Sequence, residues 1–195
     1  MGRYASAERR TKETDIRIEI DLDGDGTGKI DTGIGFFDHM MDGFARHGLL
    51  NLGITCRGDL SVDCHHSIED IGIVLGETIA RALGDKKGIS RYGHCLLPMD
   101  ETLILCAVDL GGRPYLVFDA EFAGEKCGDM DTQMAREFFY AVSYSAKMNI
   151  HIKKIYGSND HHIMEGIFKA FARSLRSACQ PDPRVGGIPS TKGVL

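Results

Sequence analysis

Asp63-Cys64-His65-His66-Ser67-Ile68-Glu69-Asp70 recurs near the other end of the chain as Asp160-His161-His162-Ile163-Met164-Glu165. If each segment is helical, successive residues are turned by about 100°, so His65 and Glu69 share one face and His66 points away from it. A single ion would not readily bind both histidines of one pair. Imidazole with carboxylate is the ligand mixture that divalent transition metals favour. The repeat therefore predicts two metal ions, with one imidazole of each pair serving each ion.

The composition and charge exclude several classes of protein. The chain has 195 residues, enough for one ordinary domain or two small ones, and 43% of them are apolar, as in soluble globular proteins. No apolar run reaches the roughly eighteen residues of a membrane span. The net charge of −5, without a basic tract interleaved with aromatic residues, speaks against general nucleic-acid binding.

The start of the chain and the cysteines predict a cytoplasmic protein. Residues 1–15 are polar with mixed charges and lack the apolar core of a signal peptide. Six cysteines stand without a Cys-x-x-Cys pair, which argues against a disulfide scaffold or a zinc knuckle. The reduced cytoplasm is therefore the expected compartment.

Hydrophobic periodicity predicts an order of strand, strand, helix, strand, helix in the first half of the chain, residues 1–90. Three isoleucines alternate with charged residues over 15–21, which is the period of a half-buried strand. Turn residues over 23–26 and the start of a second strand at 29–31 predict a hairpin. The remaining predicted elements of this half are helices at 36–47 and 65–83 with a strand at 51–57 between them.

The second half, residues 91–180, is predicted to repeat this order. Its predicted elements are strands at 93–98, 101–110, 114–118 and 149–156 and helices at 133–145 and 161–178. Prolines and glycines predict irregular structure over the tail, 181–195. Two like halves can bury their apolar helix faces against each other. The expected fold class is α+β, an internal duplication of a ββ(β)αβα half with the helices packed between two four-stranded sheets.

Alignment of the two halves assigns counterparts to further metal candidates. The histidine pairs are 96 residues apart, and upstream of the loop before each pair the offset becomes 98. This offset pairs His39, which follows Asp38 on a predicted helix, with Glu137. His39 is therefore expected to be a ligand, with Asp38 and Asp42 as candidate hydrogen-bond partners. Glu137 is either a further ligand or a solvated charge beside Arg136, and the sequence leaves both open.

Four further motifs accompany the two histidine segments between about Arg10 and Leu195. They are Thr32-Gly33-Ile34-Gly35-Phe36-Phe37-Asp38-His39-Met40, Pro98-Met99-Asp100, Phe168-Lys169-Ala170 and Pro189-Ser190-Thr191-Lys192-Gly193. This set resembles the imidazoleglycerol-phosphate dehydratase family of histidine biosynthesis, and without a preceding phosphatase domain it resembles the single-function form. The resemblance implies a duplicated fold of the kind called ribosomal protein S5 domain 2-like.

The resemblance also implies an assembly and a metal centre. The family forms 24-subunit shells with two manganese ions per site at subunit contacts, so a homo-oligomer without nucleic-acid or membrane partners is expected. The residues that match the family's metal ligands are His39, His65, His66, Glu69, His161, His162 and Glu165. Many members carry a further ligand histidine where this chain has Glu137. Either that carboxylate coordinates in its place or another histidine, such as His151, approaches the metal.

The reaction that the resemblance implies removes water from imidazole glycerol phosphate to give imidazole acetol phosphate, a hydro-lyase step. The proton to be lost lies on a carbon next to an imidazole ring, so a base alone faces a very weak acid. Two cations can hold the ring as an imidazolate through both nitrogens, and the ring can then expel the hydroxyl through a diazafulvene-like intermediate. Glu13 matches a substrate-contacting glutamate of the family, and Glu13, Glu69 and Glu165 are the candidates for proton transfer.

The substrate's phosphate requires cationic and hydroxyl groups on an acidic protein. The residues that match the family's phosphate contacts are Arg91, Arg113, Lys169, Ser190 and Lys192. The other residues expected at the substrate are Glu13, His39, His47, His65 and His161. His47 is included because it closes the first predicted helix, in a stretch that lines the substrate site in the family.

Two other functions also fit a paired metal site. A di-metal hydrolase acting on phosphate esters or amides would use the same ions and carboxylates. A metal-storage or structural shell would carry glutamate and histidine on helices, but it would not need the arginine and lysine residues. The identity of the metal stays open on chemical grounds, because nitrogen and oxygen ligands accept manganese, iron, cobalt or zinc.

Overall fold

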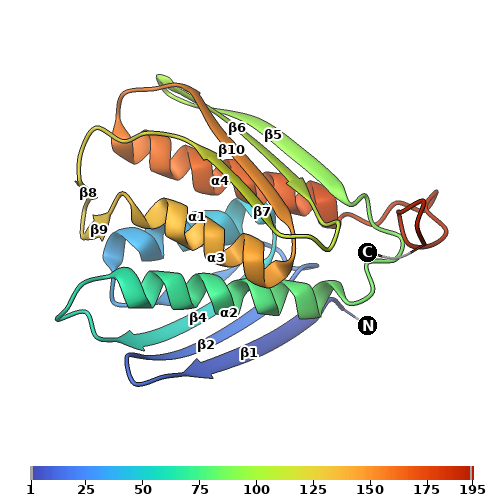
Figure 1. Cartoon of the computed structure of the whole chain (residues 1–195), viewed down its shortest axis with the longest axis horizontal. Helices are drawn as coiled ribbons and strands as arrows, with labels where there is room; N and C mark the ends of the chain where they lie inside the picture. The colour runs from blue at the N-terminus through green and yellow to red at the C-terminus, as the bar shows by residue number, and fades with distance from the viewer. Residues whose placement is uncertain (1, 194) are drawn as a thin grey trace.

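The computed structural model describes residues 2–193 and 195, and in this part of the chain four helices lie between two four-stranded sheets (Figure 1). This arrangement confirms the predicted α+β fold class. The predicted first half and tail extend over Met1 and Val194, which lie outside the described residues. None of the described helices combines the length and the apolar composition needed to cross a bilayer.

The N-terminal half forms one sheet and two helices. Its elements are β1 (Tyr4–Arg10), β2 (Thr14–Asp21), β3 (Gly28–Asp31), α1 (Gly35–Gly48), β4 (Asn51–Gly58) and α2 (His65–Leu83). The strand order is β1-β2-β4-β3, in which β3 is parallel to β4 and the other neighbours are antiparallel. On β2 the three isoleucines are buried and the residues between them face outward more, as the two-residue period of a strand requires.

The C-terminal half forms the second sheet and the other two helices. Its elements are β5 (Tyr92–Met99), β6 (Thr102–Asp109), β7 (Tyr115–Asp119), α3 (Met134–Ala146), β10 (Asn149–Tyr156) and α4 (Asp160–Cys179). The strand order is β5-β6-β10-β7, which matches the first sheet position for position. A small hairpin that the sequence does not predict, β8 (Lys126–Cys127) with β9 (Met130–Asp131), precedes α3.

The register of the sheets makes the duplication exact enough to align residues. Tyr4 on β1 pairs with Asp21 as Tyr92 on β5 pairs with Asp109, so residues 88 apart are equivalent in these strands. The first helix of each half is followed by a residue in the left-handed region, and that residue is Leu49 (φ 49°) after α1 and Lys147 (φ 51°) after α3. These two residues show the offset of 98 that the sequence predicts.

The predicted hairpin between 15–21 and 29–31 is wrong. In the structure β2 pairs with β1 and β4, and β3 lies at the far edge of the sheet, parallel to β4. The partner that the sequence does not reveal is β1, which lies in the polar start of the chain and is mostly exposed. An edge strand with little hydrophobic alternation gives no periodic signal, so the pairing of β2 could not be assigned.

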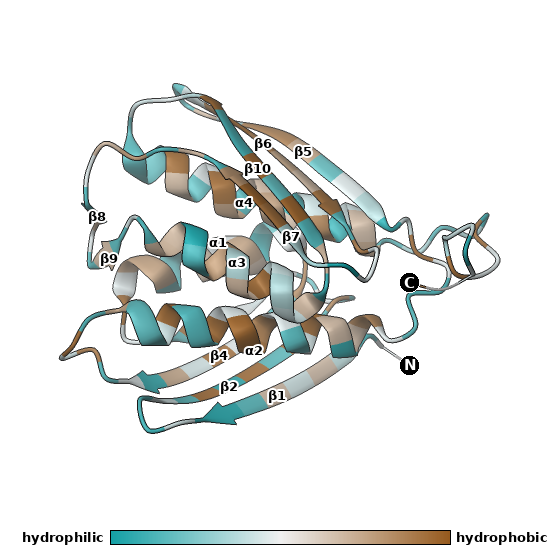
Figure 2. Ribbon diagram, viewed as in Figure 1, coloured by the Kyte–Doolittle hydropathy of each residue, from teal (hydrophilic) through white to brown (hydrophobic). Residues whose placement is uncertain are grey.

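The helices pack in pairs that join the two halves, α1 against α4 and α2 against α3 (Figure 1). Phe37 on α1 packs edge-on against Phe138 on α3 and Phe168 on α4, with ring centroids 5.4 Å and 6.2 Å away. Figure 2 shows the hydrophobic residues of the helices along the surfaces that face one another and the sheets. The core therefore belongs to both halves together.

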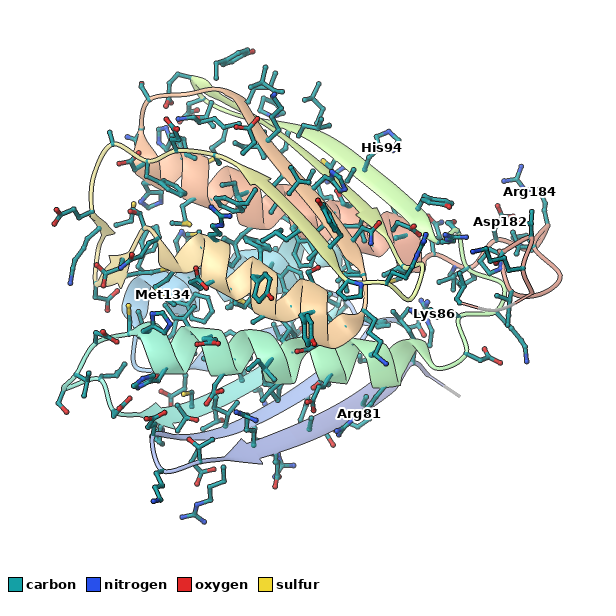
Figure 3. All side chains as sticks on the ribbon, in the orientation of Figure 1. Arg81, Lys86, His94, Met134, Asp182 and Arg184 are labelled. Carbon is teal, nitrogen blue, oxygen red and sulfur yellow. The ribbon has the colours of Figure 1, made fainter. Side chains whose placement is uncertain are left out.

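All four helices begin at the same end of the molecule. Gly72 on α2 approaches Phe138 on α3, and Gly76 approaches Val142, so these two helices run in the same direction. Figure 3 places Met134, the first residue of α3, at this end, and Lys86 and Asp182 at the opposite end. Both histidine motifs lie in the first turns of α2 and α4, so they share the end marked by Met134.

Candidate functional site

Three candidate ligands from two helices meet at the helix N-terminal end. Nε2 of His161 lies 3.2 Å from Oε2 of Glu165, one turn further along α4. His39 reaches the same oxygen from α1, with its Nε2 atom 3.9 Å away. Among the described residues, these three form the one group whose donor atoms all lie within 4.8 Å of one another. Two ring nitrogens and a carboxylate are donors that a divalent transition metal accepts, so these residues fit the predicted ion.

Local structure holds this group in place. The side-chain oxygen of Asn159 caps α4 by accepting hydrogen bonds from the backbone N–H groups of His161 and His162. Nζ of Lys169 lies 2.6 Å from Oε1 of Glu165, which leaves Oε2 toward the two histidines. Desolvation by burial opposes ionisation of Glu165, but the hydrogen bond and the charge of Lys169 hold its pKa below the usual value. Glu165 is therefore an ionised ligand candidate.

The first histidine motif supplies a similar pair on α2. Nε2 of His65 lies 3.3 Å from Oε2 of Glu69, one turn later. Glu137, the repeat counterpart of His39, lies in the first turn of α3, which packs against α2 as α1 packs against α4. The described residues do not include a group in which Glu137 joins His65 and Glu69 within 4.8 Å. The ligand roles of Glu137 and of His151, which lies on β10, stay predictions.

The second histidine of each pair lies outside these groups and is held by a carboxylate. Nδ1 of His66 lies 3.0 Å from Oδ2 of Asp59, and Nδ1 of His162 lies 2.7 Å from Oε2 of Glu101. By accepting this hydrogen bond, each carboxylate raises the pKa of its histidine. Neither acid is predicted from the sequence, because both lie in turns without periodic signal. Glu101 is the repeat counterpart of Glu13 only in the register of β1 and β5, which the sequence does not reveal.

Glu13 lies in the turn between β1 and β2, exposed, with Oε2 3.9 Å from Nδ1 of His66. The hydroxyl of Thr11 accepts hydrogen bonds from the backbone N–H groups of Glu13 and Thr14. The hydroxyl of Thr14 in turn donates to the buried carboxylate of Asp70 on α2, at 2.6 Å. These contacts fix the turn against α2, so the predicted proton-transfer residue lies beside a predicted metal ligand.

Four of the five predicted phosphate-binding residues gather in one pocket at the other end of the molecule. Its volume is about 780 Å³, and its walls are the turn at 111–113 and the tail. The predicted residues that line it are Arg91, Arg113, Ser190 and Lys192. The described tail residues, 181–193 and 195, form no helix or strand, as predicted, yet the tail folds back so that its Gly187 carbonyl accepts a hydrogen bond from the backbone N–H of Gly88. The Ser190 hydroxyl accepts a hydrogen bond from the backbone N–H of Lys192.

Arg91 is already engaged within this pocket. Its Nε donates to Oδ1 of Asp109 at 2.8 Å and its Nη2 to Oδ2 at 3.2 Å, while Nη1 donates to the carbonyl of Pro189 at 2.8 Å. Only 13% of its side chain is exposed. Arg91 therefore anchors the tail to β6, because it binds Asp109 at the end of β6 and Pro189 in the tail. The sequence analysis does not predict Asp109 as a partner. Arg113 and Lys192 are exposed and present their charges to the pocket.

The fifth residue, Lys169, and the predicted contact His47 lie outside this pocket. Lys169 binds Glu165 on α4. His47 lies at the end of α1. Its pKa is lowered, mainly by burial and further by the nearby positive charges of Lys169 and Arg173. The structure thus divides the predicted substrate contacts into a set near the metal ligands and a set in the pocket.

The two sets are too far apart to serve one small molecule within a single chain. The backbone N–H of Arg91 donates to the carbonyl of Ala178, near the end of α4, whereas His161 lies in its first turn. At 1.5 Å per residue, the seventeen residues between these points span about 25 Å. The pocket and the metal ligands therefore lie at opposite ends of the helix layer.

Comparisons with known proteins agree on one family. The family model described as imidazoleglycerol-phosphate dehydratase matches residues 32–175. Proteins of that name from Lachnoclostridium phytofermentans and Acetivibrio thermocellus are 58% and 54% identical to this chain, with both chains covered completely. A solved imidazoleglycerol-phosphate dehydratase from Staphylococcus aureus has a TM-score of 0.83 and 42% identity, covering 91% of this chain and 99% of its own. The corresponding structure from Pyrococcus furiosus has a TM-score of 0.83 and 37% identity, covering 97% of this chain and 100% of its own.

Proposed function

The chain belongs to the imidazoleglycerol-phosphate dehydratase family, whose dehydration step serves histidine biosynthesis, and we propose that it performs this step with two manganese ions per site. When bound, two divalent cations would withdraw electron density from the imidazole ring of the substrate and acidify the neighbouring carbon-bound proton. The convergence of His39, His161 and Glu165 on one point is the observation that carries this proposal.

Residues at the start of α2 would bind the second ion of the proposal. His65 and Glu69 repeat the spacing and the approach of His161 and Glu165, and Glu137 would complete the group from α3. A carboxylate in that place would give this ion one more negative ligand than its partner. The two groups together provide donors for two ions without using His66 or His162.

Two or more chains build each complete site in this proposal. His66 and His162 lie outside the three-residue groups, and their Nδ1 atoms are engaged. Nε2 of His162 lies 3.6 Å from the exposed carboxylate of Asp100, beyond hydrogen-bond distance, so we assign both Nε2 atoms to an ion held by another subunit. The separation of about 25 Å along α4 also requires that the phosphate pocket of one chain serve the ions of another. A closed assembly, with the 24 subunits typical of the family, would satisfy both needs.

We assign proton transfer to Glu13. Glu69 and Glu165 would donate their carboxylate oxygens to the ions, which leaves them poor acceptors for a proton. The Glu13 carboxylate is exposed, and its turn is fixed to the helix that carries the ligands His65 and Glu69. It could therefore take or return a proton at the edge of the bound ring.

The phosphate of the substrate is proposed to bind Arg113, Lys192 and Ser190 of one chain. Arg113 and Lys192 are exposed cations, and the Ser190 hydroxyl can donate to a phosphate oxygen. Arg91 would support this pocket through the tail that it anchors. The six unpaired cysteines fit the reducing cytoplasm that we propose as the compartment.

Turnover of imidazole glycerol phosphate, with metal analysis of the same sample, tests the proposal. A ketone product together with about two ions per chain is the expected result. Release of inorganic phosphate without ketone would favour the hydrolase alternative. Many ions per chain without turnover would favour metal storage.

A further inference from the structure

Glu101 connects three parts of the chain at the start of α4. Its Oε2 atom lies 2.7 Å from Nδ1 of His162. Its Oε1 atom accepts hydrogen bonds from the backbone N–H groups of Ser158 and Asn159 and from the hydroxyl of Thr102, at 3.2 Å, 2.8 Å and 3.0 Å. An ionised carboxylate only accepts hydrogen bonds, so Nδ1 of His162 must carry the proton. The other ring nitrogen, Nε2, is then left with its lone pair for a metal ion.

His66 in the first half has an equivalent partner that comes from a different place. Oδ2 of Asp59 lies 3.0 Å from its Nδ1 atom. Asp59 belongs to residues 59–64 between β4 and α2, whereas only residues 157–159 separate β10 from α4. That shorter connection contains glycine, serine and asparagine but no acid. We call His66 and His162, the second histidine of each pair, the outer histidines. Each half therefore orients its outer histidine with one carboxylate, but the two carboxylates are not repeat counterparts.

The repeat counterpart of Glu101 is Glu13. The turn between β1 and β2 corresponds to the turn between β5 and β6, in which residues 88 apart are equivalent. Glu13 stands 3.9 Å from Nδ1 of His66, too far for a hydrogen bond, because Asp59 occupies that nitrogen. In the first half, Asp59 of the longer loop thus accepts the hydrogen bond from the outer histidine. In the second half, Glu101, the counterpart of Glu13, accepts it.

We propose that Glu101 and Asp59 are positioning residues that present Nε2 of His162 and His66 to metal ions, and that this division leaves Glu13 free for proton transfer. The inference rests on the proposed function, because it assumes that the outer histidines are metal ligands. It makes the two halves of the duplicated chain chemically unequal. Glu101 orients the metal ligand His162, whereas its repeat counterpart Glu13 serves the substrate.

Replacement of each carboxylate tests the positioning role directly. In Glu101→Gln the amide oxygen can still accept from Ser158 and Asn159, but an amide NH₂ group faces Nδ1 of His162. That group donates, so it favours the ring form with the proton on Nε2, which cannot bind a metal. Asp59→Ala removes the acceptor of His66 altogether, because in the described residues the Asp59 carboxylate accepts hydrogen bonds from no other group and an asparagine could turn its amide oxygen toward Nδ1.

The expected result is a loss of metal affinity that differs among the three variants. Glu101→Gln and Asp59→Ala should each weaken manganese binding about 10- to 100-fold, measured by competition with a chelating dye, with the melting temperature of the chelated protein unchanged. Glu13→Gln should bind manganese as the unchanged protein does, while kcat falls. Glu8→Gln, an exposed acid on β1, serves as the matched control and should change neither quantity.

Wild-type manganese affinity in both Glu101→Gln and Asp59→Ala would overturn the inference, as would a loss of affinity in Glu13→Gln equal to theirs. If Glu101→Gln lowers the melting temperature, Asp59→Ala decides the question, since among the described residues the Asp59 carboxylate accepts hydrogen bonds from His66 alone. Failure of the proposed function looks different. In that case the wild-type protein would not bind metal in a stoichiometric amount, or would not form the ketone.

Discussion

Nε2 of His39 on α1 and Oε2 of Glu165 on α4 lie 3.9 Å apart, although the two residues come from opposite halves of the chain. An ion between them would join the two halves. Because His39 belongs to only one of the two proposed ligand groups, His39→Ala should remove a ligand from one ion and leave the other ion unchanged. We expect bound manganese to fall from about two ions per chain to about one, measured by elemental analysis after gel filtration. His94→Ala, an exposed histidine on β5 (Figure 3), should keep both ions. Equal metal content in the two variants would remove His39 from the ligand set.

Arg113 is the exposed guanidinium of the pocket and makes no ion pair with any described side chain. Since a charged hydrogen bond contributes about 1.5–3 kcal/mol, Arg113→Ala should lower kcat/KM about 10- to 100-fold. The metal content should not change, because the pocket and the metal ligands occupy opposite ends of α4. Arg184→Ala, which removes an exposed tail arginine paired with Asp182, is the matched control and should retain activity. Unchanged kinetics in Arg113→Ala would place the phosphate elsewhere.

The sequence predicts the helices and the histidine–glutamate pairs at their starts because both depend on local spacing. Period-3.6 apolar residues mark all four helices, and the i, i+4 spacing puts His161 beside Glu165 on one face. The strand pairing depends on contacts between distant segments. β1 gives no signal of its own, so the sequence assigns β2 to the wrong partner, β3.

Residues that act through another residue are the ones that the sequence does not reveal. Asp59, Glu101 and Asp109 lie in turns or at a strand end, where an acid is common for reasons of solubility. Only the fold shows that their carboxylates hold His66, His162 and Arg91. The duplication offered one route to Glu101, but it needed the register of β1, which was not predicted.

Removal of metal should shrink the assembly. If His66 and His162 of one chain bind ions held by another, the ions bridge subunits and binding is linked to association. Treatment with a chelator, followed by light scattering during gel filtration, should therefore show a smaller species, and added manganese should restore the larger one. An identical mass before and after chelation would place the ions within one chain or show an assembly that stands without them.

The ion pair between Arg3 and Asp23 should make stability depend on pH in the acid range. Hydrogen bonds from Arg3, although desolvation opposes them, hold the pKa of Asp23 below its usual value of 3.8. Because the folded pKa is the lower one, the contribution is present above about pH 4 and disappears as the pH falls through the folded pKa. Asp23→Asn should lose about 0.2–1 kcal/mol of unfolding free energy at pH 7. Its stability should then fall less than that of the unchanged protein between pH 5 and pH 3. Parallel declines in denaturant midpoint would contradict this role.

The close approach of α2 to α3 should be the least tolerant packing in the helix layer. A Cβ atom at Gly76 would lie 2.8 Å from the carbonyl oxygen of Val142 and 2.9 Å from the backbone nitrogen of Ala146, and backbone atoms cannot turn aside. Gly76→Ala should therefore lower the unfolding free energy by about 1–3 kcal/mol, even though alanine favours a helix. Gly43→Ala on α1 is the control, since its Cβ would meet nothing within 4 Å. It should raise stability by up to about 1 kcal/mol. Both are measured by denaturant unfolding of the chelated protein. Only Gly76→Ala should also weaken metal binding, because it displaces the helix that carries His65 and Glu69, whereas Gly43→Ala leaves α1 and its His39 in place.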